Sequence, residues 1–167
     1  RLVLLRILSH RKRVCRPGGR NMACNEASFC VVRKGRTMPR HDFRRIDPRS
    51  ILTEKDLERK SAMIQYLAQE SRVDVLDILH EKGTGHWGGA ASAAELLAVL
   101  YFHELDIRPD EPRWPDRDRL VISKGHASCM IYTILAKRGF FPLDELHSFR
   151  QINSRLQGHP CMNKTPG

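Results

Sequence analysis

The sequence feature that most restricts the fold is a short apolar run that leads directly into a glycine-histidine pair. Residues 119–123 read Arg-Leu-Val-Ile-Ser, and Lys124, Gly125 and His126 follow at once. A run of branched apolar residues after turn-forming residues predicts a strand that is buried in a parallel sheet. The next stretch, residues 128–138, is predicted to be a helix. A strand, a tight turn and a helix in this order place ligands at the carboxyl end of the strand and anions at the helix N-terminus.

A long amphipathic helix is predicted upstream of this strand. Thr53 has the character of a helix N-cap, and Asp56 stands three residues later as its capping-box partner. Apolar residues from Leu57 onward recur at a spacing that favours a helix of up to about seven turns. Gly83 and Gly85 interrupt this pattern, which predicts the end of the helix there.

A glycine-rich loop and a second helix are expected next. Four glycines within residues 83–89 predict a loop whose backbone can approach a ligand or another chain closely. Ser92 and Glu95 form a second capping box, and the residues from there to Phe102 are apolar nearly all round. Such a helix is expected to be buried on more than one side, in a large core or an oligomer interface. A further short helix is predicted over residues 142–149.

Three of the eight histidines directly follow a glycine in a loop or at a strand end: Gly85-His86, Gly125-His126 and Gly158-His159. Imidazole donates to phosphate or hydroxyl oxygens and moves protons near neutral pH, and a neighbouring glycine leaves room for a ligand. One such histidine is more often a solvated loop residue or a structural one. Three together indicate a polar pocket for an anionic or hydroxylated ligand. The remaining five are expected to be surface or core residues: His10, His41, His80, His103 and His147.

Metal and thiol chemistry have weaker support in the sequence. The three glycine-linked histidines are far apart and no His-Glu-x-x-His motif accompanies them, so we expect no metal site. Cys129 lies in the expected first turn of a helix, where a buried structural thiol is the common case, whereas Cys161 lies two residues after His159. Five cysteines without a Cys-x-x-Cys pair argue against a secreted disulfide framework and favour a reducing, cytoplasmic compartment.

Charge divides the chain into a basic front segment and a nearly neutral body. Residues 1–50 contain 14 of the 29 Lys and Arg residues but 3 of the 19 acidic residues, and residues 51–167 contain the other 15 and 16. We expect a domain over residues 51–167, preceded over residues 1–50 by a disordered or non-native leader with an extended lead-in. A non-native upstream sequence with the true start at Met22 or Met38 is favoured. A transit peptide and a basic nucleic-acid-binding arm remain open alternatives.

Several stretches of the body resemble transketolase, and most closely the N-terminal subunit of split transketolases, a group of thiamine diphosphate enzymes. The likeness covers about two-thirds of the chain. DRDRLVISKGHA and LQGHP are highly specific in combination, and the related deoxyxylulose-phosphate synthases lack the SKGHA form. The stretches that carry the resemblance are GHWGGAASAAELLAVLYF, WPDRDRLVISKGHASCMIYTILAKRGFF, LHSFRQINSRLQGHP and KTPG.

The resemblance implies a fold and a reaction. The family fold is a doubly wound α/β domain that binds the cofactor diphosphate, and this chain would hold a mostly helical part of it with one or a few parallel strands. The family reaction transfers a two-carbon ketol unit from a ketose phosphate to an aldose phosphate. Thiamine diphosphate performs the carbanion chemistry, while protein groups orient and polarise the reactants.

The resemblance also implies roles for individual residues. By motif match, His126 contacts the cofactor diphosphate. His86 lies near the reacting carbonyl, where it donates to the sugar hydroxyls or moves their protons, and His159 binds a hydroxyl of the donor sugar. His86 and His159 are therefore the implied catalytic residues. The implied cofactor-binding residues are Lys124, Gly125, His126 and Gly158.

Some elements of the family pattern do not occur between Arg1 and Gly167. In the family, a Gly-Asp-Gly motif followed by an Asn holds the Mg²⁺ that bridges the diphosphate, and a glutamate that activates the aminopyrimidine belongs to another domain or subunit. We therefore expect a truncated piece of the cofactor-binding domain that has no transketolase activity alone and at most weak cofactor affinity. Trp87 stands where the family often has Pro or Ile, and it would narrow the pocket or pack on a partner chain.

The expected partners follow from the same resemblance. They are sugar phosphates and a C-terminal transketolase subunit that carries the pyrimidine-binding domain, within a homo- or hetero-oligomer. No membrane partner is expected, since no apolar run approaches the roughly 20 residues of a membrane-spanning helix. A nucleic-acid partner is not expected either. The alternatives are a non-catalytic interaction module that docks through residues 92–102 and a nucleic-acid-associated protein that uses the basic front segment.

Overall fold

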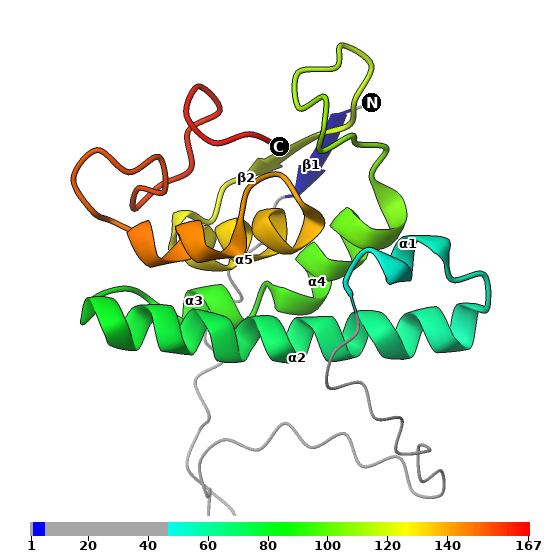
Figure 1. Ribbon diagram of the computed structural model, residues 1–167, viewed down its shortest axis with the longest axis horizontal. Coiled ribbons are helices and arrows are strands. Elements are labelled where there is room, and N and C mark those ends of the chain that lie inside the picture. Colours follow the sequence, from blue (N-terminus) through cyan, green and yellow to red (C-terminus); the bar gives the residue numbers. More distant parts are fainter. Residues whose placement is uncertain (1, 6–46) are drawn as a thin grey trace, which may run out of the picture. The chain divides into compact units, whose positions relative to one another are not determined.

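The computed structural model describes residues 2–5 and 47–167 (Figure 1). Residues 149–167, after the last helix, contain no helix or strand. None of the helices in the described part is long and apolar enough to cross a membrane. The elements are β1 (Leu2–Leu5), α1 (Ser50–Thr53), α2 (Leu57–Lys82), α3 (Trp87–Ala91), α4 (Ala94–Val99), the π-helical turn η1 (Leu100–Glu104), β2 (Arg119–Ile122), the 3₁₀ turn η2 (Gly125–Ala127), α5 (Ser128–Arg138) and the 3₁₀ helix η3 (Leu143–Ser148).

The long helix α2 occurs where periodicity predicts it, but its cap is different. Asp56 is the N-cap, and its carboxylate accepts a hydrogen bond of 2.7 Å from the Arg59 backbone N–H. The prediction of Thr53 as the cap is wrong, because Thr53 is the last residue of α1 and its hydroxyl donates to the Ser50 carbonyl. Gly83 ends the helix as predicted, with a φ of 61° that suits glycine.

The glycine-rich stretch is shorter as a loop than predicted. Residues 84–86 connect α2 to α3, and the last two of the four glycines lie inside α3. The predicted capping box at Ser92 is also wrong, because α4 begins after Ala93 and its N-terminus has no side-chain cap. The Ser92 hydroxyl instead donates to the Gly89 carbonyl and accepts a hydrogen bond from the Lys124 ammonium group.

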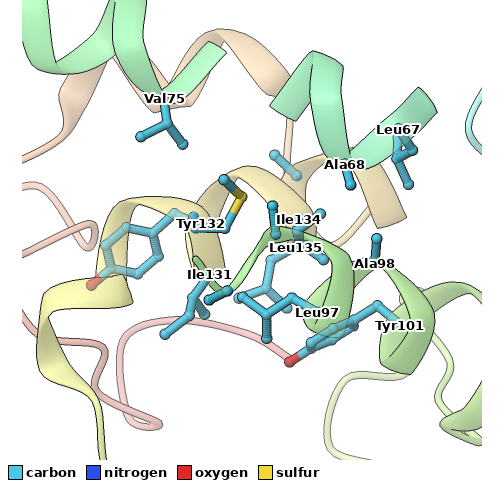
Figure 2. Packing of buried hydrophobic residues seen from close by; sticks show 14 of the residues in the cluster. Leu67, Ala68, Val75, Leu97, Ala98, Tyr101, Ile131, Tyr132, Ile134 and Leu135 are labelled. Atoms are coloured by element: carbon cyan, nitrogen blue, oxygen red, sulfur yellow. The ribbon is translucent and has the colours of Figure 1, made fainter. Parts of the chain in front are cut away.

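The core lies between α2, α4 and α5, whose apolar faces meet (Figure 2). The predicted burial of the apolar helix after Ser92 is confirmed at Leu97, Ala98 and Phe102, whereas Leu96 and Val99 on its other side remain 38% and 37% exposed. The side chains labelled in Figure 2 are Leu67, Ala68 and Val75 of α2, Leu97 and Ala98 of α4, Tyr101 of η1, and Ile131, Tyr132, Ile134 and Leu135 of α5.

One buried charge crosses the interface between α2 and α5. The Lys137 ammonium group lies 2.9 Å from Glu70 Oε2 and 2.8 Å from Asp74 Oδ2, and the lysine side chain is 5% exposed. A buried ammonium group needs such partners because water no longer solvates it. Lys137 therefore joins the C-terminal half of α5 to the middle of α2.

The predicted strand after residue 118 is present as β2 and has the predicted parallel partner. Leu2–Leu5 of β1 pairs with Arg119–Ile122 in parallel register, and no other strand occurs in the described ranges. The prediction that this strand is buried is wrong for the described residues, since Val121 is 45% exposed. A doubly wound sheet needs more strands and stays a prediction.

The front segment is described only in part. The sequence predicts a leader and an extended lead-in over residues 1–50, whereas the structure has a strand at residues 2–5 and a helix that begins at Ser50. Residues 6–46 lie outside the described residues, and the alternatives for them stay predictions. Downstream, α5 and η3 occupy the stretches predicted as helices at 128–138 and 142–149.

Candidate active site

The three glycine-linked histidines meet in one small cavity. Residues from the ends of α2 and η3, from the start of α5 and from the loop after residue 156 surround a volume of about 60 Å³. The histidines are distant in sequence, so this convergence depends on the packing of α3 and the 150–159 segment around the start of α5. The lining residues are Leu79, Gly85, His86, Gly125, His126, Ser128, Cys129, Phe149, Arg150, Gly158 and His159.

His86 and His126 are in direct contact. Their ring centroids are 4.4 Å apart, and the ring planes are inclined at 78°. His86 precedes α3 directly, and His126 lies in η2, immediately before α5. The N-terminal end of a helix carries partial positive charge from its unpaired N–H groups, so His126 stands where an anion is favoured.

A glycine allows α3 to pack against His126. A methyl group added at Gly89 would lie 2.7 Å from the His126 Cβ and 3.1 Å from the His126 carbonyl oxygen. Real Cβ atoms do not approach other carbons this closely, so a side chain at this position requires the backbone of η2 to move. In contrast, a methyl group added at Gly88 would have no neighbour within 4 Å.

A second glycine allows His159 to cover the turn after β2. A methyl group added at Gly125 would lie 2.7 Å from Cδ2 and 2.8 Å from Nε2 of His159. The imidazole of His159 therefore lies directly over the Gly125 backbone. Gly158, the other glycine predicted to bind cofactor, also lines the cavity.

Arg150 is a lining residue that the sequence analysis missed. Its guanidinium group donates a hydrogen bond of 2.7 Å to the Thr84 hydroxyl, and its backbone has a φ of 58°. A methyl group added at Gly158 would lie 3.4 Å from the arginine side chain, so the guanidinium group passes close to this glycine. Arg150 thus adds a positive charge beside the imidazoles. Its occurrence nine residues before His159 is the only sequence signal, and a weak one.

Lys124 is not among the residues that line the histidine cavity. Its ammonium group donates to the Ser92 hydroxyl, and the residue lines a neighbouring cavity of about 320 Å³ beside β2. Gly125 borders both cavities. The role of Lys124 in cofactor binding stays a prediction.

No group of three metal-ligating side chains occurs in the described part of the chain.

Two free cysteines lie near the histidines and differ sharply in environment. Cys129 is buried, as predicted, and burial raises the pKa of its thiol to about 12, whereas Cys161 is exposed. A raised pKa lowers the thiolate fraction, so Cys129 is a poor nucleophile at neutral pH.

This difference predicts selective alkylation. At about pH 8, iodoacetamide is expected to modify Cys161 and to leave Cys129 unmodified until the chain is unfolded. Peptide mass spectrometry with and without denaturant measures both positions in one experiment. Equal labelling of the two thiols in the folded protein would contradict the burial of Cys129.

Fold and site together define a class of protein: an α/β domain in which three imidazoles line a cavity at the start of a helix. A model of the transketolase thiamine diphosphate binding domain matches residues 63–167, more than half of the chain. The chain therefore belongs to this family. The matched residues contain the stretches that carry the resemblance in the sequence, and all three site histidines lie within them.

Individual relatives agree with the family match. The chain is 40% identical over 104 residues to the 6-deoxy-6-sulfo-D-fructose transketolase subunit of Clostridium sp. (strain MSTE9). These 104 residues make up 62% of the chain and 38% of that protein. The chain is 43% identical over 97 residues to transketolase 2 of Xanthobacter flavus, covering 58% and 14%, and 38% identical over 103 residues to human transketolase, covering 62% and 16%. The matched part thus spans less than two-fifths of these relatives.

Proposed function

We propose that this chain takes part in a transketolase reaction, in which a two-carbon ketol unit moves from a ketose phosphate to an aldose phosphate. The observation that carries the proposal is the convergence of His86, His126 and His159 in a domain of the thiamine diphosphate binding family. Thiamine diphosphate would supply the carbanion chemistry. The protein side chains then bind, orient and exchange protons with the sugar substrates.

The proposed roles follow from position. His126, at the start of α5, donates to the diphosphate, because helix N–H groups and an imidazole N–H favour the same anion. His86 touches His126 and is placed to exchange a proton with a sugar hydroxyl. His159 lies over Gly125 and binds a hydroxyl of the donor. Arg150 contributes positive charge on the same side.

The donor set fits an anion, and the size of the cavity limits how much of it enters. The cavity has a volume of about 60 Å³ and is partly open, and its three histidines are exposed. A phosphoryl or hydroxyl group would contact the residues that line this space, and the cofactor rings would need room outside it. We therefore propose that this chain supplies the diphosphate side of the cofactor site. Gly125 and Gly158 line the histidine cavity, and Lys124 lines the neighbouring cavity beside β2.

The proposal includes the groups that accompany this chemistry in the family. Mg²⁺ bound to the diphosphate, a subunit that carries the pyrimidine-binding domain, a homo- or hetero-oligomer and a cytoplasmic location belong to it. Further parallel strands beside β2 would complete a doubly wound sheet. The absence of a Cys-x-x-Cys pair supports the reducing compartment.

Calorimetry tests cofactor recognition. With Mg²⁺ present, thiamine diphosphate is expected to bind the full chain at least about tenfold more tightly than thiamine, since the proposed contacts are made to the diphosphate. His126→Ala is expected to remove most of this difference. His103→Ala is the matched control, because His103 is exposed, contacts Glu104 and does not line the histidine cavity. Equal affinities for the two ligands in the unchanged protein would refute the proposed cofactor site.

The reaction itself is tested on natively purified protein with any subunit that accompanies it. Two-carbon transfer from a ketose phosphate to an aldose phosphate is expected only when thiamine diphosphate and Mg²⁺ are supplied. Cofactor binding without transfer in every such preparation would instead favour a non-catalytic module.

A further inference from the structure

A buried tyrosine connects α5 to the loop that carries His159. Tyr132 is 0% exposed, and its hydroxyl donates a hydrogen bond of 2.8 Å to the Gln157 carbonyl. Figure 2 shows its ring at the border of the core cluster, with the hydroxyl oxygen directed away from the other labelled side chains. Gly158 and His159 follow Gln157 directly in the sequence. The tyrosine therefore contacts the backbone two residues before the imidazole.

The same ring also contacts the other end of this loop. Tyr132 and Phe149 pack edge to face, with ring centroids 6.0 Å apart and an interplanar angle of 61°. Between these contacts, the Arg150 backbone N–H donates to the Leu156 carbonyl at 2.8 Å and closes the segment into a compact loop. One side chain of α5 thus touches both ends of the segment that presents Arg150 and His159.

The hydroxyl is suited to a lasting structural contact. Burial raises the pKa of Tyr132 to about 12, and a hydrogen bond with Thr165 opposes this shift. The phenol therefore stays protonated, and able to donate, throughout the physiological pH range. Loss of this donor would leave the part-buried Gln157 carbonyl without its tyrosine partner.

We propose that Tyr132 is a positioning residue for His159. α5 begins next to His126 and holds, through Tyr132, the loop that places His159 over Gly125. One helix thereby sets the distance between the imidazole at the diphosphate and the imidazole at the sugar. The inference rests on the proposed function for what His159 binds, but not for where His159 lies.

The test compares two tyrosine hydroxyls in the full chain. Tyr132→Phe keeps the ring and removes the hydroxyl, which donates to the Gln157 carbonyl and has a hydrogen bond with Thr165. Tyr101→Phe is the matched control, because Tyr101 is also buried, at 5% exposure, and its ring packs edge to face on Phe140. NMR of the imidazole C–H groups reports each histidine separately, without ligand. The thermal unfolding midpoint, measured in parallel, reports general loss of stability.

The proposal predicts a selective result. In Tyr132→Phe, the His159 signals shift, while the His86 and His126 signals stay in place. The unfolding midpoint falls by only about 2–4 °C. Tyr101→Phe leaves all three histidines unchanged. His159 signals that are identical in Tyr132→Phe and the unchanged protein overturn the proposal, as does an equal shift of all three histidines.

A second measurement decides the matter if Tyr132→Phe does not fold. Hydrogen exchange of the Arg150 amide in the unchanged protein reports whether the loop opens with α5 or independently of it. We expect the Arg150 amide to exchange on the timescale of the α5 amides. Exchange as fast as that of Ile152, which is 92% exposed, overturns the proposal. Because both measurements are made without ligand, a failure to bind thiamine diphosphate refutes the proposed function and leaves this inference to be decided separately.

Discussion

Gly89→Ala is expected to damage both the stability and the ligand binding of this protein. The new methyl group would lie 2.7 Å from the His126 Cβ and 3.1 Å from the His126 carbonyl oxygen. The clash involves backbone, so it cannot be relieved by rotation of a side chain. Overpacking of this kind costs about 1–3 kcal/mol in the free energy of unfolding. Displacement of His126 should also weaken the binding of thiamine diphosphate by about tenfold or more, which corresponds to about 1.4 kcal/mol.

The neighbouring glycine provides the control for this prediction. Gly88 lies in the same five-residue helix, α3, and a methyl group there would have no neighbour within 4 Å. Alanine favours a helix over glycine by about 1 kcal/mol, so Gly88→Ala should be neutral or stabilising. Chemical denaturation and calorimetry on both variants separate the effect of helix propensity from that of the clash. Equal behaviour of the two variants would show that α3 does not pack against His126 as described.

Gly125→Ala is expected to have its largest effect on ligand binding. The added methyl group would lie 2.7 Å and 2.8 Å from two ring atoms of His159. In this case the clash is with a side chain, and the imidazole can swing outward. We therefore expect a loss of stability of about 1 kcal/mol, at the low end for overpacking, but a large loss of any contact made by His159. The NMR signals of the His159 imidazole C–H groups should shift in Gly125→Ala, because the ring is displaced from Gly125.

A double substitution provides the control for His159. If Gly125→Ala acts by displacing this imidazole, then adding His159→Ala should cause little further loss of ligand affinity, because coupled sites are not additive. Fully additive losses would mean that the two positions act independently. The unfolding free energy of each variant shows whether both proteins remain folded at the temperature of the titration.

The site was predictable to the extent that it depends on local sequence. His86, His126 and His159 each follow a glycine, and glycine is needed where one backbone passes close to another group. The structure shows this need directly at Gly125, over which His159 lies. The strand, turn and helix around His126 were also predictable from local sequence. A short apolar run predicts the strand, and the Ser-Lys-Gly-His sequence that follows it marks the turn before the next helix.

Features that depend on distant residues were not predictable. Arg150 lines the cavity with a backbone φ of 58°, and its side chain donates a hydrogen bond to Thr84, which is 66 residues away in the sequence. Ser92 resembles a helix cap in sequence, but its hydroxyl bonds to Lys124, 32 residues away. Local propensity is a weak guide when a tertiary partner competes for the same hydroxyl. The prediction of Thr53 as the N-cap with Asp56 as its capping-box partner failed because both residue types are good caps, and Thr53 is the last residue of a separate short helix, α1.

The buried Lys137 determines how α5 can slide along α2. An interface of leucine, isoleucine and alanine side chains tolerates several alignments, whereas the buried Lys137 ammonium group favours the alignment that pairs it with both Glu70 and Asp74. Slippage by one helical turn would carry His126 about 5.4 Å along the axis and away from its partners. The ion pairs of Lys137, near the C-terminal end of α5, thus help to set the position along α2 of His126, just before the start of α5.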